Sequence, residues 1–138
     1  MKKNNNILYI LLIIILLFAV FFNNYYFSGH DTVIHLTNII NYSYTINIHN
    51  IFGSFVYPNI GNNFGYGTGI FYPFIPEYIP ALLYKATNNI FISMKLYYFL
   101  IVFISGIGML LLCNKIYKNK YISLISSSLY ICMPYFIT

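Results

Sequence analysis

Apolar residues in this chain come in long blocks rather than at the spacing of one helix face or one strand face. Residues 7–22 read ILYILLIIILLFAVFF and carry no charge. At about 1.5 Å per residue this run nearly crosses the hydrocarbon of a bilayer, and residues 23–27 extend it to the interface. Residues 92–113 and 121–138 form two further apolar runs. The pattern predicts an all-α membrane protein with about three transmembrane helices.

The first run has an alternative interpretation as a cleaved signal peptide. Its apolar core is long for that role, and no Ala-x-Ala-like site follows Ala19. We therefore expect an uncleaved anchor.

Lysine positions predict the orientation of these helices. Lys2 and Lys3 precede the first run, and a cluster of lysines lies between the last two runs, at 115, 118 and 120. Because cytoplasmic loops are enriched in basic residues, both regions are expected in the cytoplasm. The expected segments are the N-terminus with the first transmembrane helix (1–27), an extracytoplasmic loop (28–91), a second helix (92–113), a cytoplasmic loop (114–120) and a third helix (121–138). The expected location is the plasma membrane.

The long first outer loop predicts two amphipathic surface helices. Ser28 and Asp31 resemble a helix start, with Ser28 as N-cap and Asp31 at the third helical position. At 100° per residue one polar stripe then forms, and it contains Asp31, His35, Asn38, Tyr42, Thr45 and His49. Such a helix suits the bilayer surface, and its end near Asn47 is the least defined part. Pro76 and Glu77 predict a second surface helix over 76–87, whose charged residues would face the headgroups or the first helix.

Composition narrows the class of protein further. Hydrophobic residues make up 59% of the chain and charged residues 7%, which excludes an ordinary soluble domain. The net charge of +5 comes from lysine alone and follows the membrane topology, so no nucleic-acid partner is expected. Gly65, Gly67 and Gly69 have the spacing of a nucleotide loop but lack the flanking strand and helix. Cys113 and Cys132 are far apart in apolar sequence and are expected to be spectator thiols.

Asp31 is the strongest candidate for chemistry, since it is one of only two acidic residues. Its carboxylate suits a general base or a ligand of a divalent metal, and the alternative is a simple helix cap. His35 lies four residues later on the same helix face, where it is a candidate supporting residue or metal ligand, or a plain surface hydrogen-bond partner. Weaker candidates for substrate binding are Asn38, Tyr42, Tyr66, Tyr72 and Glu77.

Several short motifs together resemble a known family. They are Gly29-His30-Asp31 with His35, Gly65-Tyr66-Gly67, and Phe71-Tyr72-Pro73 with Pro76, Tyr78, Ala81 and Leu82. Lys95-Leu96, Gly106 with Gly108-Met109, and Tyr130 with Pro134-Tyr135 also fit. The set resembles the start of bacterial multi-pass membrane proteins labelled "6-pyruvoyl-tetrahydropterin synthase-related", which look like GT-C-type glycosyltransferases.

The resemblance implies an integral membrane glycosyltransferase that uses a polyprenyl-phosphate-linked sugar at the outer leaflet. It implies that Asp31 is the base or metal partner. Chains of this family are several times longer, so the remaining transmembrane helices would come from a longer chain or a partner subunit, and this segment alone is expected to be inactive. A non-catalytic membrane subunit or truncated product is the main alternative. A transporter or flippase fragment is a weaker one, because the first run has no ionisable residue near the bilayer midplane.

Overall fold

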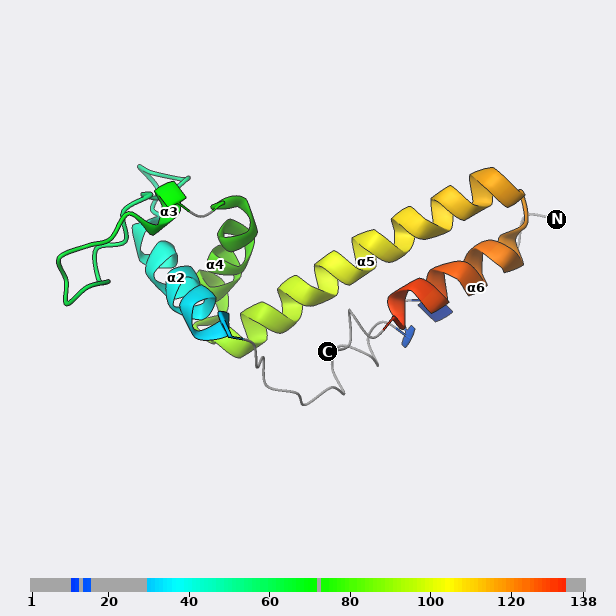
Figure 1. Cartoon of the computed structure of the whole chain (residues 1–138), viewed down its shortest axis with the longest axis horizontal. Helices are drawn as coiled ribbons and strands as arrows, with labels where there is room; N and C mark the ends of the chain where they lie inside the picture. Colours follow the sequence, from blue (N-terminus) through cyan, green and yellow to red (C-terminus); the bar gives the residue numbers. More distant parts are fainter. Residues whose placement is uncertain (1–10, 13, 16–29, 72, 134–138) are drawn as a thin grey trace. The chain divides into compact units, whose positions relative to one another are not determined.

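The computed structural model describes residues 11, 12, 14, 15, 30–71 and 73–133. This part of the chain is all-α, as predicted, and the β-structure within it is limited to two isolated bridges. Its helices are α2 (Thr32–Thr45), α3 (Thr68–Phe71), α4 (Ile75–Thr87), α5 (Ile90–Tyr117) and α6 (Lys120–Ile131) (Figure 1).

The chain divides into two compact units. The helix-pair unit comprises Tyr26–Tyr97, and the hairpin unit comprises Met1–Tyr25 together with Tyr98–Thr138. The long helix α5 begins in the first unit and continues into the second.

In the helix-pair unit, α2 and α4 pack against each other (Figure 1). Their core contains Ile39, Tyr42, Ile46, Tyr57 and Ala81. The predicted polar stripe of α2 supplies part of this interior, because Asn38 and Tyr42 are buried. Apolar side chains of the same helix, Val33 and Tyr44 among them, are exposed. The buried part of the stripe therefore faces α4. The sequence pattern alone did not say which face of the helix would meet another helix.

Helix α4 matches the second predicted surface helix and begins one residue earlier, at Ile75. Pro76 occupies its first turn, where a missing N–H costs no hydrogen bond. The helix ends where Asn88 adopts a left-handed conformation, with a φ of 51°, and donates its backbone N–H to the Tyr84 carbonyl. The Lys85 ammonium donates to the backbone carbonyl of Ile46, which is the C-cap of α2. This bond ties the ends of the two helices together.

The connection between α2 and α3 is rich in glycine and asparagine and is held by specific hydrogen bonds. Tyr57 and Tyr66 form an antiparallel bridge with N–O distances of 2.9 and 3.1 Å. At Gly53, where φ is +69°, an added Cβ would lie 2.6 Å from Thr45 Oγ1, so only glycine fits. The Tyr42 hydroxyl donates to the Phe52 carbonyl at 2.6 Å. The loop is thus held against the end of α2.

In the hairpin unit, α5 and α6 approach closely at one small residue. The Ser127 hydroxyl donates to the Gly106 carbonyl at 2.7 Å, and an added Cβ at Gly106 would lie 2.6 Å from Ile131 Cδ1. The two helices therefore approach closely at Gly106, whereas Gly108 has open space beside it. Asn119 caps the start of α6 by accepting hydrogen bonds from the backbone N–H groups of residues 121 and 122.

Helix α5 is long and apolar enough to cross a membrane. Its 28 residues correspond to about 42 Å, and the 19 uncharged residues between Lys95 and Lys115 correspond to about 29 Å, close to the thickness of bilayer hydrocarbon. It contains the whole of the second predicted transmembrane helix. Among the described residues it is the one such helix.

The other two predicted spans stay predictions. The first, residues 7–22, lies outside the described residues except at positions 11, 12, 14 and 15. The third begins as α6, which has 12 residues, and residues 134–138 lie outside the described part.

Candidate functional site

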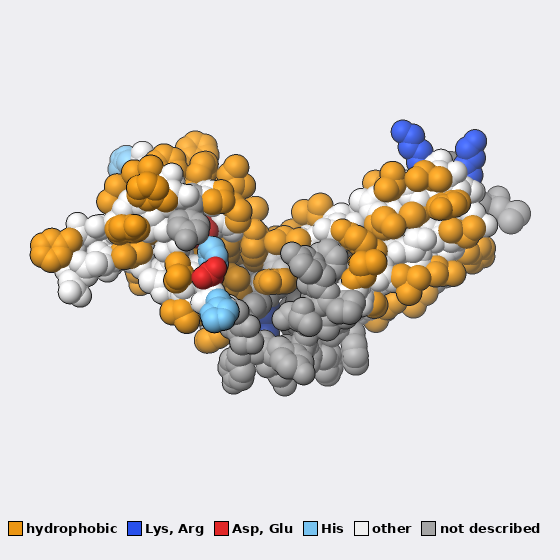
Figure 2. All heavy atoms as spheres, in the orientation of Figure 1, with side chains coloured by type: hydrophobic (Ala, Val, Ile, Leu, Met, Phe, Trp, Pro, Cys, Tyr) orange, Lys and Arg blue, Asp and Glu red, His pale blue; other side chains and the backbone are white. Residues whose placement is uncertain are grey.

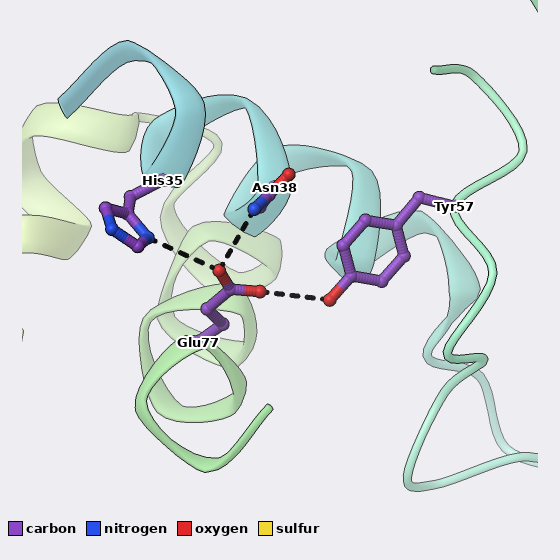
Figure 3. A network of polar contacts seen from close by, with 4 residues as sticks. All are labelled: His35, Asn38, Tyr57 and Glu77. Atoms are coloured by element: carbon purple, nitrogen blue, oxygen red, sulfur yellow. Dashed lines mark hydrogen bonds and ion pairs between the residues drawn. The ribbon is translucent and has the colours of Figure 1, made fainter. Parts of the chain in front are cut away.

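The centre of the helix-pair unit is a buried carboxylate, that of Glu77 in the first turn of α4 (Figure 3). Its Oε1 accepts a hydrogen bond from Asn38 Nδ2 at 3.2 Å, and its Oε2 accepts one from the Tyr57 hydroxyl at 3.0 Å. These donors come from α2 and from the connecting loop, so one side chain joins three segments. Burying a carboxylate is costly unless hydrogen bonds compensate it, and this one has a donor on each oxygen.

His35 adds a third contact to the same carboxylate. Its Nδ1 lies 3.5 Å from Glu77 Oε1, and its side chain is about half exposed, at 48%. Figure 3 shows the ring extending from α2 toward the carboxylate beside Asn38. When the imidazole is protonated, this contact becomes an ion pair that reaches the protein surface.

The electrostatics of this network keep its tyrosine neutral. Burial raises the pKa of the Tyr57 hydroxyl well above its usual range, and the Glu77 charge and hydrogen bond raise it further. Burial likewise raises the pKa of Tyr42, with smaller effects from Tyr78 and Glu77. Tyr57 is therefore a stable hydrogen-bond donor at neutral pH and is poorly suited to proton transfer.

Asp31 lies at the N-cap of α2 rather than at the third helical position, because the helix begins at Thr32. The earlier cap expected at Ser28 falls outside the described residues. Asp31 is exposed, and its carboxylate makes no capping hydrogen bond, although its backbone carbonyl accepts the N–H of His35 at 3.0 Å. The cap alternative is therefore not supported by a side-chain bond, and the carboxylate is accessible from solution.

Asp31 and His35 are one turn apart, but the side chain of His35 contacts Glu77. Among the described residues no group of three or more His, Cys, Asp or Glu side chains is arranged to hold a metal ion. Asp31 and His35 are two candidate ligands, fewer than the three protein ligands of a catalytic zinc site. Figure 2 shows acidic and histidine side chains near one another on a largely hydrophobic surface.

The structure separates the five candidate substrate contacts into three groups. Asn38, Tyr42 and Glu77 are buried in the packing of the helix-pair unit. Tyr66 is exposed, with its ring centroid 6.5 Å from that of Phe71. Tyr72 lies outside the described residues. A substrate-binding role for these side chains stays a prediction.

Tyr57 is not among the residues that the sequence pattern singles out, yet it is fully buried and completes the Glu77 network. It lies 20 residues from Glu77 in a loop without hydrophobic periodicity, so no local pattern singles it out. The charged residues of the second surface helix were expected to face the headgroups or the first helix. The two helices pack together, and the contacts of Glu77 on α2 are His35 and Asn38 rather than Asp31.

No protein-family model, curated protein or solved structure matches this chain. The geometry of the described residues therefore carries the functional argument.

Proposed function

We propose that this chain is the N-terminal module of a GT-C-like integral membrane glycosyltransferase that uses a polyprenyl-phosphate-linked sugar at the outer leaflet. The proposal includes a cytoplasmic N-terminus and an extracytoplasmic helix-pair unit. Remaining transmembrane helices, from a longer chain or a partner subunit, would complete the donor site. The motif resemblance supports the enzyme class. The observation that supports the role of Asp31 is its exposed carboxylate, which makes no capping bond and lies at the start of a helix that Glu77 fixes to α4.

Asp31 would act as general base in this reaction. The acceptor hydroxyl oxygen attacks the anomeric carbon of the donor, the bond from that carbon to the phosphate oxygen breaks, and the acceptor proton passes to the Asp31 carboxylate. The polyprenyl phosphate leaves with the bonding electrons. An accessible carboxylate on a rigid helix suits this role, since a base must reach hydrogen-bond distance of its proton and keep its position.

His35 would be a positioning residue rather than a base. It shares one turn of α2 with Asp31, and its ring contacts the buried Glu77 carboxylate.

The experiment is transfer of a radiolabelled sugar from a polyprenyl phosphate donor by the full-length gene product in membranes. Asp31→Asn should abolish transfer while membrane insertion and abundance are retained, because the amide cannot accept the proton. The matched control is His49→Asn, a change at another exposed polar position of the same unit. Transfer by Asp31→Asn at the control's rate would refute the catalytic role.

A non-catalytic membrane subunit is the second candidate, and a specific observation favours it. Much of the polar stripe of α2 takes part in internal packing. Asn38 and Tyr42 are buried, and Asn38 and His35 both contact Glu77. In that case Asp31→Asn leaves every transfer reaction unchanged. Mild detergent extraction would instead co-purify a partner that supplies further transmembrane helices.

A further inference from the structure

The helix-pair unit has an inverted distribution of polarity. Its only glutamate is buried, while large apolar side chains are exposed on both helices and on the loop between them. The exposed set is Val33, Ile34 and Tyr44 on α2, Ile75, Ile79 and Leu82 on α4, and Ile48, Ile51, Phe52, Phe55, Val56 and Phe64 on the loop. Figure 2 shows hydrophobic side chains over much of this surface. A surface this apolar is unusual in water and indicates a partner.

Charge identifies the chemistry of that partner. Residues 30–97 contain two acidic residues and two lysines, so their formal charge is zero. Of these four side chains, Glu77 is turned inward and Lys85 bonds the end of α2. The surface therefore has few charged groups that could bind an anionic or cationic macromolecule. An apolar partner with a polar boundary fits this surface better.

The chain itself brings this surface to a membrane boundary. Two residues, Asn88 and Asn89, separate α4 from α5, so the end of α4 is within about 10 Å of chain from the start of the candidate span. Lys95 lies within the helix-pair unit, and the uncharged stretch of α5 begins directly after it. A lysine at that position extends its ammonium to the headgroups, which places the lipid boundary at Lys95. The lipid boundary thus falls within the residues of the helix-pair unit.

The loop supplies the side chain best suited to enter the lipid. Phe64 is 93% exposed and lies in the turn that the Tyr57–Tyr66 bridge closes. The residues around it have positive φ, namely Asn62, Asn63 and Gly65. Because these residue types tolerate a left-handed backbone, the turn can hold the bulky Phe64 ring without strain at its neighbours. Holding a phenyl ring in water has no folding benefit, and burying it in acyl chains is favourable by the hydrophobic effect.

We infer that the helix-pair unit is embedded in the interfacial layer of the bilayer, with Phe64 inserted among the acyl chains as an anchor. The occupant of the exposed apolar surface is lipid. Binding depends on apolar burial and not on headgroup charge. This inference does not require the Asp31 chemistry, and it holds for a catalytic or a non-catalytic chain.

The absence of tryptophan from the sequence makes a direct test possible. Single-tryptophan variants of the full chain are reconstituted at high lipid-to-protein ratio into zwitterionic phosphatidylcholine vesicles. Phe64→Trp is compared with Asn59→Trp, an exposed polar position of the same loop, and with Ile104→Trp in the middle of α5. Emission is quenched from the lipid side by brominated acyl chains and from the water side by iodide.

Phe64→Trp should emit at shorter wavelength than Asn59→Trp, lose emission to brominated lipid as Ile104→Trp does, and resist iodide. Anionic lipid and added salt should leave the quenching by brominated lipid unchanged. Quenching of Phe64→Trp by iodide to the same degree as Asn59→Trp would overturn the inference. So would protection from both quenchers, which indicates a protein partner on the loop, or a failure of brominated lipid to quench Ile104→Trp.

Discussion

The Tyr57–Glu77 hydrogen bond gives the sharpest test of how the helix-pair unit is held together. Tyr57 is fully buried, and its hydroxyl donates to a buried carboxylate at 3.0 Å. Tyr57→Phe removes the hydroxyl and keeps the ring, whose centroid lies 5.4 Å from that of Tyr42. Hydrogen bonds to charged groups contribute about 1.5–3 kcal/mol. Because Glu77 keeps the Asn38 donor, we expect a loss in the lower half of that range.

Native-state hydrogen exchange of the full chain in lipid nanodiscs measures this loss directly. A loss of about 1.5–2.2 kcal/mol in opening free energy accelerates exchange roughly 10- to 40-fold. The acceleration should appear at the amides of α2 and α4, and the part of α5 between Lys95 and Lys115 should be unaffected. The matched control is Tyr66→Phe, since that ring is exposed and its change should stay within about 0.5 kcal/mol.

A double-mutant cycle separates the hydrogen bond from other effects of the substitution. Combined with Glu77→Gln, the Tyr57→Phe change should cost less than it does alone, with a coupling of about 0.5–3 kcal/mol. Additive costs would mean that the two side chains do not interact. Equal exchange rates for Tyr57→Phe and Tyr66→Phe would refute the reasoning that places this bond at the centre of the unit.

Three further predictions concern pH, helix packing and topology. The pKa of Tyr57 is raised in the folded state, so its neutral hydroxyl contributes fully to the stability of the unit below the unfolded-state pKa of about 10. This contribution should be lost as the pH rises above 10. Hydrogen exchange should show a smaller loss of stability with pH in Tyr57→Phe than in the unaltered chain. Gly106→Leu should cost about 1–3 kcal/mol by forcing Ile131 away, whereas Gly108→Leu, with open space beside it, should leave thermal stability in detergent nearly unchanged. Asn62→Cys, with both native cysteines replaced by serine, should be labelled by an impermeant maleimide on intact cells, and labelling only after lysis would reverse the proposed orientation.

The sequence was sufficient to predict the helical class and the approximate bounds of α4 and α5. Proline at a helix start and uncharged stretches bounded by lysine are local signals, and they do not depend on tertiary contacts. Four of the six predicted members of the polar stripe, His35, Asn38, Tyr42 and Thr45, lie on α2, whereas Asp31 is its N-cap and His49 lies beyond its end. The direction of the stripe was not predictable, because periodicity identifies two faces of a helix and does not say which one meets another helix and which one meets lipid.

The parts of the site that the sequence did not predict depend on contacts between distant residues. Glu77 bonds Asn38 across 39 residues and Tyr57 across 20. Nothing in the apolar stretch around Glu77 indicates that its carboxylate would be buried with a donor on each oxygen. The start of α2 also differs by a few residues from the expected one, which moved Asp31 from inside the helix to its N-cap. Helix ends are the least defined feature of a sequence pattern.

The polar interior and the exposed carboxylate have different consequences for function. The hydrogen bonds of Glu77 with Asn38 and Tyr57 hold α2 on α4. A substitution at any of these residues should therefore shift α2 as a whole, and Asp31 with it. Asp31 makes no capping bond, so changing it should leave the helix pair intact. A loss of transfer in Glu77→Gln would therefore indicate a catalytic role of Glu77 only if hydrogen exchange in α2 were unchanged. The same loss in Asp31→Asn, with normal exchange in α2, would place the chemistry at the carboxylate itself.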